Sequence, residues 1–373
     1  MLRRVTLNGF KSIKAMDLEL RSLNVLIGAN GAGKSNLVSF FKMLNEMMGG
    51  RLQQYIGTNG RAQSILHYGP KVTPEMRTRL EFQFDDGSGI ESRLDVYAMR
   101  LTHSTGDSLA FVNEIIYPSE SLIINAQGLG GTGHQETRIG HAADSGSPIK
   151  RPASALRDLL NQCRVYHFHD TSLTARVRQY CYIGDNRSLM NDAGNVAAFL
   201  MRLRETNRNV YQNILSTIRL IAPFFKDFDL EPTGIGPDVI LNWRDNGSDQ
   251  IFGPHQLSDG TLRAICLITL LLQPVDELPM LIIVDEPELG LHPYALNVIA
   301  ALFKKASHHT QVLISTQSTS FLDNFDAEDV IVVSREGKTS QFTRPDPEKL
   351  ESWLDEYSLG EVWEKNVIGG GPH

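Results

Sequence analysis

The segment that most restricts the fold of this chain is residues 28–35, which read GANGAGKS. It satisfies the pattern G-x-x-x-x-G-K-[ST], follows an apolar run and precedes apolar residues at helical spacing. Glycines let a backbone curl so that its N–H groups point inward, and the following helix adds the positive end of its dipole. A strand, this loop and a helix together predict a phosphate-binding loop.

The polar residues of this loop indicate which phosphate compound it binds. Lys34 places a positive charge at the β- and γ-phosphates, and the hydroxyl of Ser35 can ligate Mg²⁺. A nucleotide with β- and γ-phosphates and Mg²⁺ are therefore the predicted ligands of this loop. The residues predicted to contact the nucleotide from this loop are Asn30, Gly31, Ala32, Gly33, Lys34, Ser35 and Asn36.

Two acids end an apolar run at residues 281–286, which read LIIVDE. An apolar strand that ends in two carboxylates needs a reason, because a buried charge without a partner is unfavourable. Beside a phosphate loop, Asp285 can hold Mg²⁺ through water, and Glu286 can orient or deprotonate the attacking water. Alone, the pair would also fit an ordinary strand end with solvated acids.

A third segment, LSDGT at residues 257–261, precedes the apolar run LRAICLITLLL. Ser258 is expected to cap a helix that starts near Thr261, so its hydroxyl, the N–H of Gly260 and the helix dipole would converge on an anion. A plain helix cap is the alternative, since serine is common there. Asp259 is unfavourable beside a phosphate unless it points away or meets a basic group.

Strand and helix patterns outline an α/β protein. Alternation predicts strands over residues 3–13 and 16–28, an antiparallel meander over 77–119, and mostly helical sequence over 195–225 before a short strand at 238–245. The last third alternates strand and helix, which implies a parallel sheet with right-handed crossovers.

The composition restricts the cellular compartment and the classes of partner that we expect. The chain has 373 residues, 41% hydrophobic and 21% charged, with a net charge of −7, which argues against wholesale coating of nucleic acid. Three widely spaced cysteines form no C-x-x-C pair, and the N-terminus lacks the apolar stretch of a signal peptide. No apolar run approaches the roughly 20 residues of a membrane span. We therefore expect a cytoplasmic protein without membrane contact.

The ordered set of phosphate loop, Ser-Gly helix cap and Asp-Glu strand end resembles the ATP-binding-cassette (ABC) ATPases, with LSDGT as a variant of their signature motif. Within them, the chain looks most like the SMC and RecF group and the ATPase domains of overcoming-lysogenization-defect nucleases. The segments VTLNGFKSI, EPELGLHP and ISTQS and the tail WLDEYSLGEVWEKNVIGG extend this resemblance over nearly the whole chain.

The resemblance implies an α/β P-loop NTPase fold, namely an ABC-type head with an N-terminal antiparallel β-meander and an inserted helical lobe. It also implies an ATP-dependent homodimer, because in that family the signature, here Ser258, Asp259 and Gly260, meets the γ-phosphate held by the other protomer. Residues 288–292 would then line the dimer interface. The expected segments are an ATPase lobe at 1–120, a flexible insertion at 121–155, a helical and basic lobe at 156–255 and a second ATPase lobe at 256–373.

Some residues depart from the family pattern. Gln317 stands where most cassette ATPases carry a switch histidine, and with Glu286 it is a predicted catalytic residue. Glutamine can hydrogen-bond the γ-phosphate or the water but carries no positive charge, so slow turnover is expected. Gln83 is a candidate for the Q-loop by position, although an outward-facing strand residue describes it better. In the segment HFHD, packing is favoured over a metal site, and His169 or Asp170 near the nucleotide is a weaker alternative.

The predicted function is Mg²⁺-dependent ATP binding and hydrolysis coupled to head-to-head dimerisation. The resemblance implies an effector partner, a nuclease or toxin, in bacterial phage defence. One alternative is a catalytically weak, ATP-gated sensor or scaffold for such an effector, and another is a RecF-like DNA-repair ATPase. Residues 150–220 carry eleven basic and five acidic side chains, a surplus of six, which would serve nucleic acid or an acidic partner unless the arginines pair locally.

Overall fold

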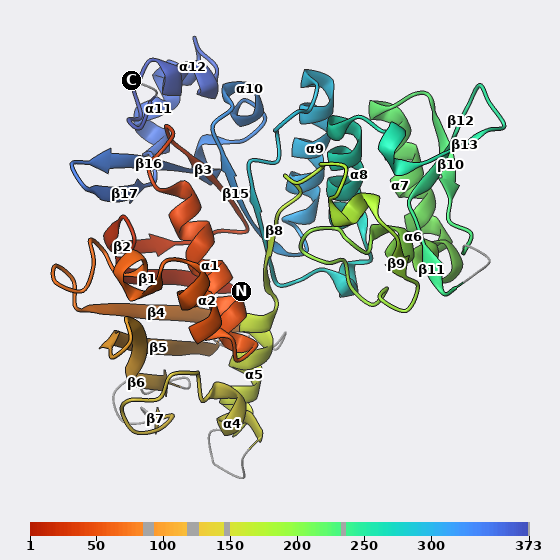
Figure 1. Cartoon of the computed structure of the whole chain (residues 1–373). Coiled ribbons are helices and arrows are strands. Elements are labelled where there is room, and N and C mark those ends of the chain that lie inside the picture. Colours follow the sequence, from red (N-terminus) through yellow and green to blue (C-terminus); the bar gives the residue numbers. More distant parts are fainter. Residues whose placement is uncertain (85–92, 118–126, 145–149, 233–235, 372–373) are drawn as a thin grey trace.

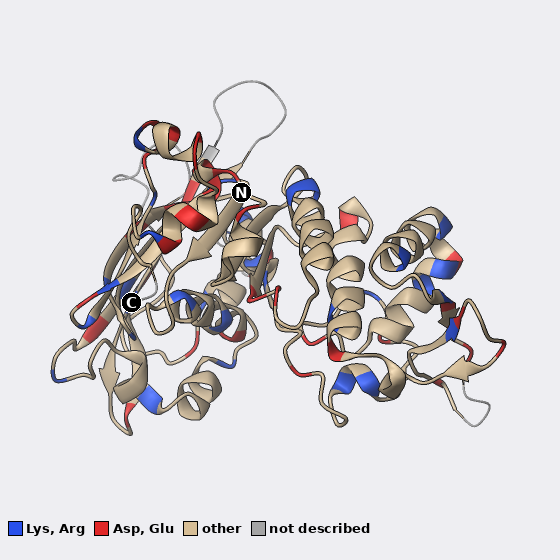
Figure 2. Cartoon of the chain, turned by 90° about the horizontal axis from the view of Figure 1, so that it is seen from above, with Lys and Arg blue, Asp and Glu red and all other residues tan. Residues whose placement is uncertain are grey.

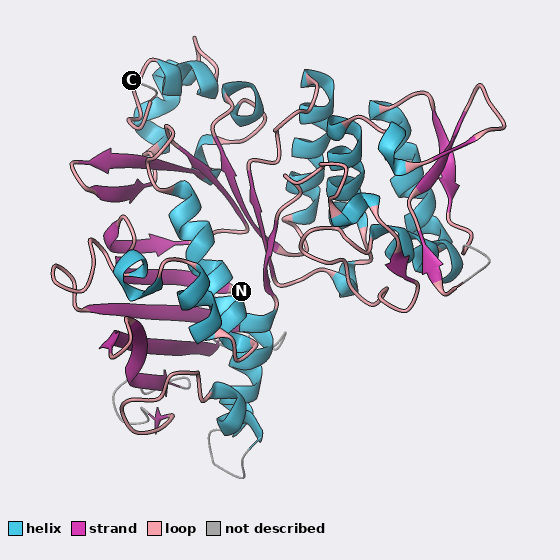
Figure 3. Ribbon diagram, viewed as in Figure 1, coloured by secondary structure: helices cyan, strands magenta, loops and turns pink. Residues whose placement is uncertain are grey.

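The computed structural model describes residues 1–84, 93–117, 127–144, 150–232 and 236–371. Figure 1 shows an antiparallel sheet and α1 on one side, a mostly parallel sheet in the middle, and the helices α6 to α9 on the other side. The view by secondary structure separates a sheet-rich half from a helix-rich half (Figure 3). Among the described helices, none combines the length and apolarity needed to cross a membrane.

The first sheet contains the meander that the sequence predicts. Every pairing in it is antiparallel, in the order β2-β1-β4-β5-β6-β7. Alternate side chains of its strands, such as Leu80 and Phe82, are buried in one apolar cluster together with α1. Its strands are β1 (Leu2–Phe10), β2 (Ile13–Glu19), β4 (Glu75–Phe84), β5 (Arg93–Ser104), β6 (Ser108–Tyr117) and β7 (Gln127–Gly128).

The second sheet has the order β17-β16-β3-β15-β14-β8, and all its pairings are parallel except that of β16 with β17. The carboxyl ends of β3, β15, β14 and β8 therefore meet at one edge. This edge receives the phosphate loop and the acid pair. The strands are β3 (Leu23–Ile27), β8 (Cys163–Tyr166), β14 (Leu281–Asp285), β15 (Gln311–Thr316), β16 (Val330–Glu336) and β17 (Thr339–Thr343).

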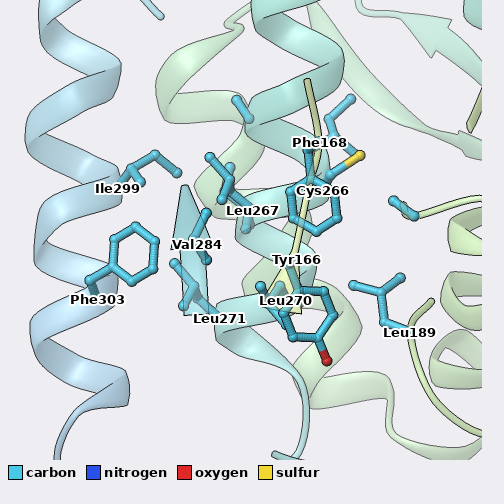
Figure 4. Close-up of a cluster of buried hydrophobic side chains, with 14 of the residues drawn as sticks. Tyr166, Phe168, Leu189, Cys266, Leu267, Leu270, Leu271, Val284, Ile299 and Phe303 are labelled. Atoms are coloured by element: carbon cyan, nitrogen blue, oxygen red, sulfur yellow. The ribbon is translucent and has the colours of Figure 1, made fainter. Parts of the chain in front are cut away.

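Both faces of the parallel sheet are covered, which explains why its strands are apolar throughout. Ile283 points into the cluster shared with α1 (Lys34–Met48) and the antiparallel sheet. Its neighbours Ile282 and Val284 belong to the cluster on the opposite face. Figure 4 shows Val284 between side chains of α8 (Asp259–Leu272) and α9 (Pro293–Ala306).

The helix-rich half packs around the same apolar cluster as α8 and α9. It contains a three-stranded sheet in the order β10-β12-β13 and a two-stranded sheet of β11 and β9. Its elements are β9 (Cys181–Tyr182), α6 (Val196–Thr206), α7 (Arg208–Ile221), β10 (Phe225–Asp229), β11 (Asp238–Val239), β12 (Asn242–Asp245) and β13 (Ile251–Phe252). The remaining helices of the chain are α2 (Leu52–Thr58), α3 (Arg61–Ile65), α4 (Ile139–Asp144), α5 (Lys150–Asn161), α10 (Thr319–Leu322), α11 (Pro347–Leu354) and α12 (Leu359–Glu364).

Two predicted strands each divide into two. The segment predicted as one strand at 16–28 forms the end of β2 and all of β3, which belong to different sheets. The buried side chain of Asn24, at the start of β3, accepts a hydrogen bond from the N–H of Arg21 (2.9 Å) and donates to its carbonyl oxygen (2.7 Å), which closes the turn between the two strands. The segment 238–245 likewise divides into β11 and β12. Alternation alone does not reveal such a change of sheet.

The predicted insertion at 121–155 contains α4 and part of α5, while residues 118–126 and 145–149 lie outside the described residues. A fully buried carboxylate, Glu114 on β6, holds the segment before α4. It accepts hydrogen bonds from Tyr97 Oη (2.7 Å), the N–H of Arg138 (3.0 Å) and the hydroxyl of Thr137, and its Oε2 lies 3.1 Å from His134 Nε2. Three donors around one carboxylate compensate its burial.

Candidate functional site

The loop between β3 and α1 has the backbone that its motif predicts. Gly31 and Gly33 adopt φ angles of +77° and +118°, in the region where glycine is favoured. A Cβ atom on Gly28 would lie 2.2 Å from a carbonyl oxygen of β16, so this position also requires glycine. α1 begins at Lys34, and Ser35 in its first turn is exposed. The helix N-terminus thus lies at the carboxyl end of β3.

Lys34 is buried within this loop. Its Nζ donates to the carbonyl oxygens of Gly28 (2.5 Å) and Ala29 (3.3 Å). Burial lowers the pKa of Lys34, while the carboxylates of Glu286 and Asp285 act against this shift. The ammonium group therefore lies within electrostatic reach of the acid pair, as binding of phosphates between them requires.

The acid pair follows β14 at the same edge. Oδ1 of Asp285 is buried and has no hydrogen-bond partner in the described part of the chain. Its carbonyl oxygen lies 2.7 Å from Nε2 of His169, which follows β8. Glu286 has a φ angle of +44°, a conformation that costs a non-glycine residue about 1–3 kcal/mol. The N–H of Glu286 donates to the carbonyl oxygen of Ser315 (2.7 Å), which fixes this turn to β15.

The two predicted catalytic side chains contact each other. β15 lies between β3 and β14, and Asp285 pairs in register with Ser315. Gln317, two residues further on, donates from Nε2 to Oε1 of Glu286 at 2.6 Å. The parallel register therefore brings together residues that are 31 positions apart in the sequence.

Four buried side-chain atoms without a hydrogen-bond partner in the described residues gather at the ends of β8, β14 and β15. Unpaired buried polar atoms are rare, and a cluster of them calls for a bound group. An Asp285 oxygen and the exposed Ser35 hydroxyl are ligands of the kind that Mg²⁺ takes together with phosphate and water. The atoms are Asp285 Oδ1, Glu288 Oε2, Ser315 Oγ and His167 Nε2.

Mg²⁺ fits this edge only if a bound phosphate supplies some of its ligands. No three His, Cys, Asp or Glu side chains of the described chain are close enough to hold a metal by themselves. Mg²⁺ typically uses one or two protein ligands and completes its shell with water and substrate phosphates. The two oxygen ligands that Ser35 and Asp285 can provide match this coordination preference.

The LSDGT segment forms the N-terminus of α8, which begins at Asp259 rather than near Thr261. The exposed Ser258 caps it, since its Oγ accepts a hydrogen bond from the N–H of Thr261 at 3.1 Å. The Asp259 carboxylate is held at 2.8 Å by Arg178, which satisfies the condition for an acid beside a phosphate. A Cβ on Gly260 would lie 2.2 Å from the carbonyl oxygen of Gly290. The helix tip therefore packs on the turn that follows the acid pair.

Arg263 on α8 connects the helix tip with the catalytic edge. It donates to the carbonyl oxygens of Phe168 (2.9 Å) and His169 (3.0 Å), which follow β8, and to that of Leu289. His169 in turn contacts Asp285. The segment HFHD thus lies between the acid pair and the signature, a position for which the sequence offered only a weak alternative.

A second set of residues lies beside Asn36. A shallow pocket of about 420 Å³ is lined there by Lys11, Ser12 and Tyr68, among others. Ser12 Oγ accepts a hydrogen bond from Asn36 Nδ2 at 2.6 Å, so the N-terminal GFKS turn touches the first turn of α1. Lys338 Nζ lies 5.1 Å from the ring centroid of Tyr68. The sequence did not predict that these residues lie beside the phosphate loop, although GFKS is part of the family resemblance.

Other candidate residues lie away from this chemistry or have partners. Gln83 lies on β4 and accepts a hydrogen bond from Arg3 (3.2 Å). Asp170 is exposed and accepts bonds from the N–H and hydroxyl of Ser172. Neither is brought to the acid pair by a contact in the described residues.

Five of the ten arginines between residues 150 and 220 form ion pairs within the described chain. Arg202 forms two hydrogen bonds with Glu277, and Arg204 lies 3.3 Å from Glu231. Figure 2 shows blue and red segments side by side over this half of the molecule. The local pairing that the sequence left open is therefore present, and it uses arginines that nucleic acid would need. Other pairs are Arg157 with Asp144, Arg176 with Asp192 and Arg178 with Asp259.

Comparison with protein families gives two matches. Residues 146–323 match a family described as "AAA domain, putative AbiEii toxin, Type IV TA system". Residues 1–55 match a family described as a protein of unknown function, DUF2813. A search of curated proteins found no match.

Solved structures share the fold. One is an SMC head bound to the C-winged helix domain of ScpA, with 16% identity and a TM-score of 0.63 over 94% of this chain and 99% of that one. Another is an Smc head domain with an extended coiled coil, bound to the C-terminal domain of ScpA derived from Pyrococcus furiosus. It shows 15% identity and a TM-score of 0.56 over 95% of this chain and 98% of that one. The predicted fold class, an ABC-type head, is confirmed.

Proposed function

We propose that this chain is an ABC-type AAA ATPase of the SMC and RecF group that binds and hydrolyses ATP between two copies of itself, because residues 146–323 match an AAA domain family and the fold is that of SMC heads. The observation that carries this proposal is the convergence of Lys34, Asp285 and the Glu286–Gln317 pair at one sheet edge. The edge combines a phosphate cradle with a carboxylate base.

Each residue has a distinct task in the proposed reaction. The loop amides and Lys34 bind the phosphates, and the pocket beside Asn36 receives the nucleoside. Mg²⁺, held by Ser35 and Asp285, would neutralise charge on the β- and γ-phosphates. Glu286 orients the attacking water and accepts its proton at the carboxylate. Because Gln317 hydrogen-bonds that carboxylate, the base is engaged until the amide moves, which supports slow turnover.

A second copy would complete the site. Ser258 and Asp259 are exposed at the tip of α8, with the helix dipole directed outward. Leu289 and Tyr294 nearby are 36% and 52% exposed. Apolar side chains beside an anion-binding helix tip support a face that closes on another head when ATP is bound. ATP would then join two heads, and hydrolysis would release them.

We also propose an effector partner in a toxin–antitoxin or phage-defence setting. The description of the matched family refers to an AbiEii toxin of a type IV TA system, which supports this context. A catalytically weak sensor remains the second candidate, because the Glu286–Gln317 bond restrains the base. No specific observation favours a RecF-like DNA function, because Arg202 and Arg204, which would contact DNA, are paired with Glu277 and Glu231.

The test compares Glu286→Gln and Lys34→Ala with the wild-type protein. Glu286→Gln should bind ATP with wild-type affinity, lose turnover by at least about 100-fold and accumulate a dimer in size-exclusion chromatography with light scattering. Lys34→Ala should lose ATP binding and remain monomeric. A wild-type protein that binds ATP and dimerises without turnover would favour the sensor, and one that binds no ATP would contradict both candidates.

A further inference from the structure

Glu288 is a buried acid that the proposed reaction does not yet use. It lies three residues beyond Asp285 and is 9% exposed. Its Oε1 accepts hydrogen bonds from the Thr316 hydroxyl (2.6 Å) and from the N–H of Gln317 (3.1 Å). Its Oε2 is buried without a partner, and no arginine or lysine of the described chain forms an ion pair with it. Burial raises the pKa of Glu288.

Neighbouring groups determine which atom donates and which accepts in these two hydrogen bonds. The Thr316 hydroxyl accepts a hydrogen bond from the N–H of Ser318 at 3.1 Å, so its own hydrogen points to Glu288. The N–H of Gln317 is a donor by nature. Oε1 of Glu288 must therefore act as an acceptor for both, a task that the carbonyl oxygen of a glutamine can also perform.

The same short segment carries the amide that contacts the base. Gln317 is attached at two points, through its N–H to Glu288 and through its side chain to Glu286. Ser318 then caps α10 by accepting from the N–H of Phe321 at 3.2 Å. The backbone of residues 316–318 is thus held by Glu288 at the place from which Gln317 reaches the active edge.

We propose that Glu288 is a positioning residue that holds the segment 316–318 so that Gln317 can act on Glu286 and on the γ-phosphate. This rests on the proposed ATPase function. The hydrogen bonds of the Glu288 side chain in the described residues go to Thr316 and Gln317, and none goes to Asp285 or Glu286. Its loss should lower kcat more than it changes KM for ATP, because the nucleotide-binding loop is left intact.

The experiment compares two substitutions of Glu288 by turnover and by amide hydrogen exchange. Glu288→Ala should lower kcat about 10- to 100-fold, change KM for ATP less than about threefold and expose the amides of residues 317 and 318 to faster exchange. Glu288→Gln, which keeps the acceptor oxygen, should recover most of the turnover and the protection. Thermal melting serves as the control that both variants are folded.

Thr316, the last residue of β15, and Thr310, just before the strand, give a variant and its matched control. Thr316→Val removes the hydroxyl that bonds Glu288 and should slow turnover without adding to the effect of Glu288→Ala. Thr310→Val removes a buried hydroxyl just before the other end of β15 and should leave kcat and the exchange of residues 317 and 318 unchanged. Equal effects of Glu288→Gln and Glu288→Ala, or unchanged exchange in Glu288→Ala, would overturn the proposal. If the wild type has no turnover, hydrolysis itself fails, and the exchange measurement alone decides the positioning.

Discussion

His167 is a single residue whose surroundings determine how stability responds to pH. Its ring follows β8, and Nε2 is buried without a partner among the described atoms. Burial, with a smaller effect of Lys42, lowers the pKa of His167 from 6.5 to about 4. The imidazole is therefore neutral at neutral pH and adds no positive charge beside the acid pair.

This shift gives a signed prediction for acid stability. As the pH falls through 6.5, unfolded chains take up a proton on His167, whereas the folded protein stays neutral there until about pH 4. The contribution of the neutral His167 to the free energy of unfolding is thus fully present above pH 6.5, and it is lost as the pH falls from about 6.5 to about 4. His167→Gln should reduce the loss of melting temperature between pH 7.5 and 5. Parallel pH profiles for the two proteins would contradict the prediction.

At the residue scale, sequence motifs identify functional residues only when these residues are close together in the sequence. The phosphate loop and the acid pair each lie within eight residues, so composition and order revealed Lys34, Asp285 and Glu286. The Glu288–Thr316 contact joins residues 28 positions apart, on elements that only the parallel register brings together. Neither residue type is unusual in its own stretch, so no local signal pointed to the pair.

Among the elements, α8 shows how an unfavourable residue becomes compatible with its position. Arg178, whose side chain is only 4% exposed, contacts Asp259 and the carbonyl oxygens of Thr171, Leu257 and Pro254. It fixes the start of α8 to the 3₁₀ turn at residues 176–178. The orientation of the signature therefore depends on one buried guanidinium group.

Removal of this group should destabilise the protein. Arg178→Ala leaves one carboxylate and three carbonyl oxygens without their donor, so we expect the free energy of unfolding to fall by about 2–4 kcal/mol. Arg176→Ala is the matched control, since its pair with Asp192 is solvent-exposed and contributes at most about 1 kcal/mol. Denaturant unfolding measures both values, and a similar loss for the two variants would argue against a special place for Arg178.

At the element scale, the helical period predicted the helices α1, α6, α7, α8 and α9, whereas α2, α3, α4 and α5 and the change of sheet were not predicted. Strand alternation continues from β2 into β3, so residues 16–28 seemed one strand, although the Asn24 turn sends the chain to another sheet. β8 has only four residues and lies at the sheet edge, so the position of HFHD beside the acid pair was not evident. Both failures arise because pairing partners are distant in sequence.

The whole molecule places its two proposed phosphate contacts in different parts of one chain. α1 belongs to the apolar cluster of the antiparallel sheet, whereas α8 belongs to the cluster of the helix-rich half (Figure 1). In the proposed dimer, one head supplies Lys34 and the other supplies the exposed Ser258. The central claim is therefore that these two residues act across a pair of chains.

Mixing two inactive variants tests this claim most directly. Lys34→Ala removes the cradle charge, and Ser258→Leu removes the cap and blocks the helix tip; each alone should turn over ATP at less than about a tenth of the wild-type rate. An equal mixture forms mixed dimers that keep one intact site, so about a quarter of the wild-type rate per chain is expected. A mixture no faster than its components, or wild-type turnover by Ser258→Leu alone, would contradict a site shared between two chains.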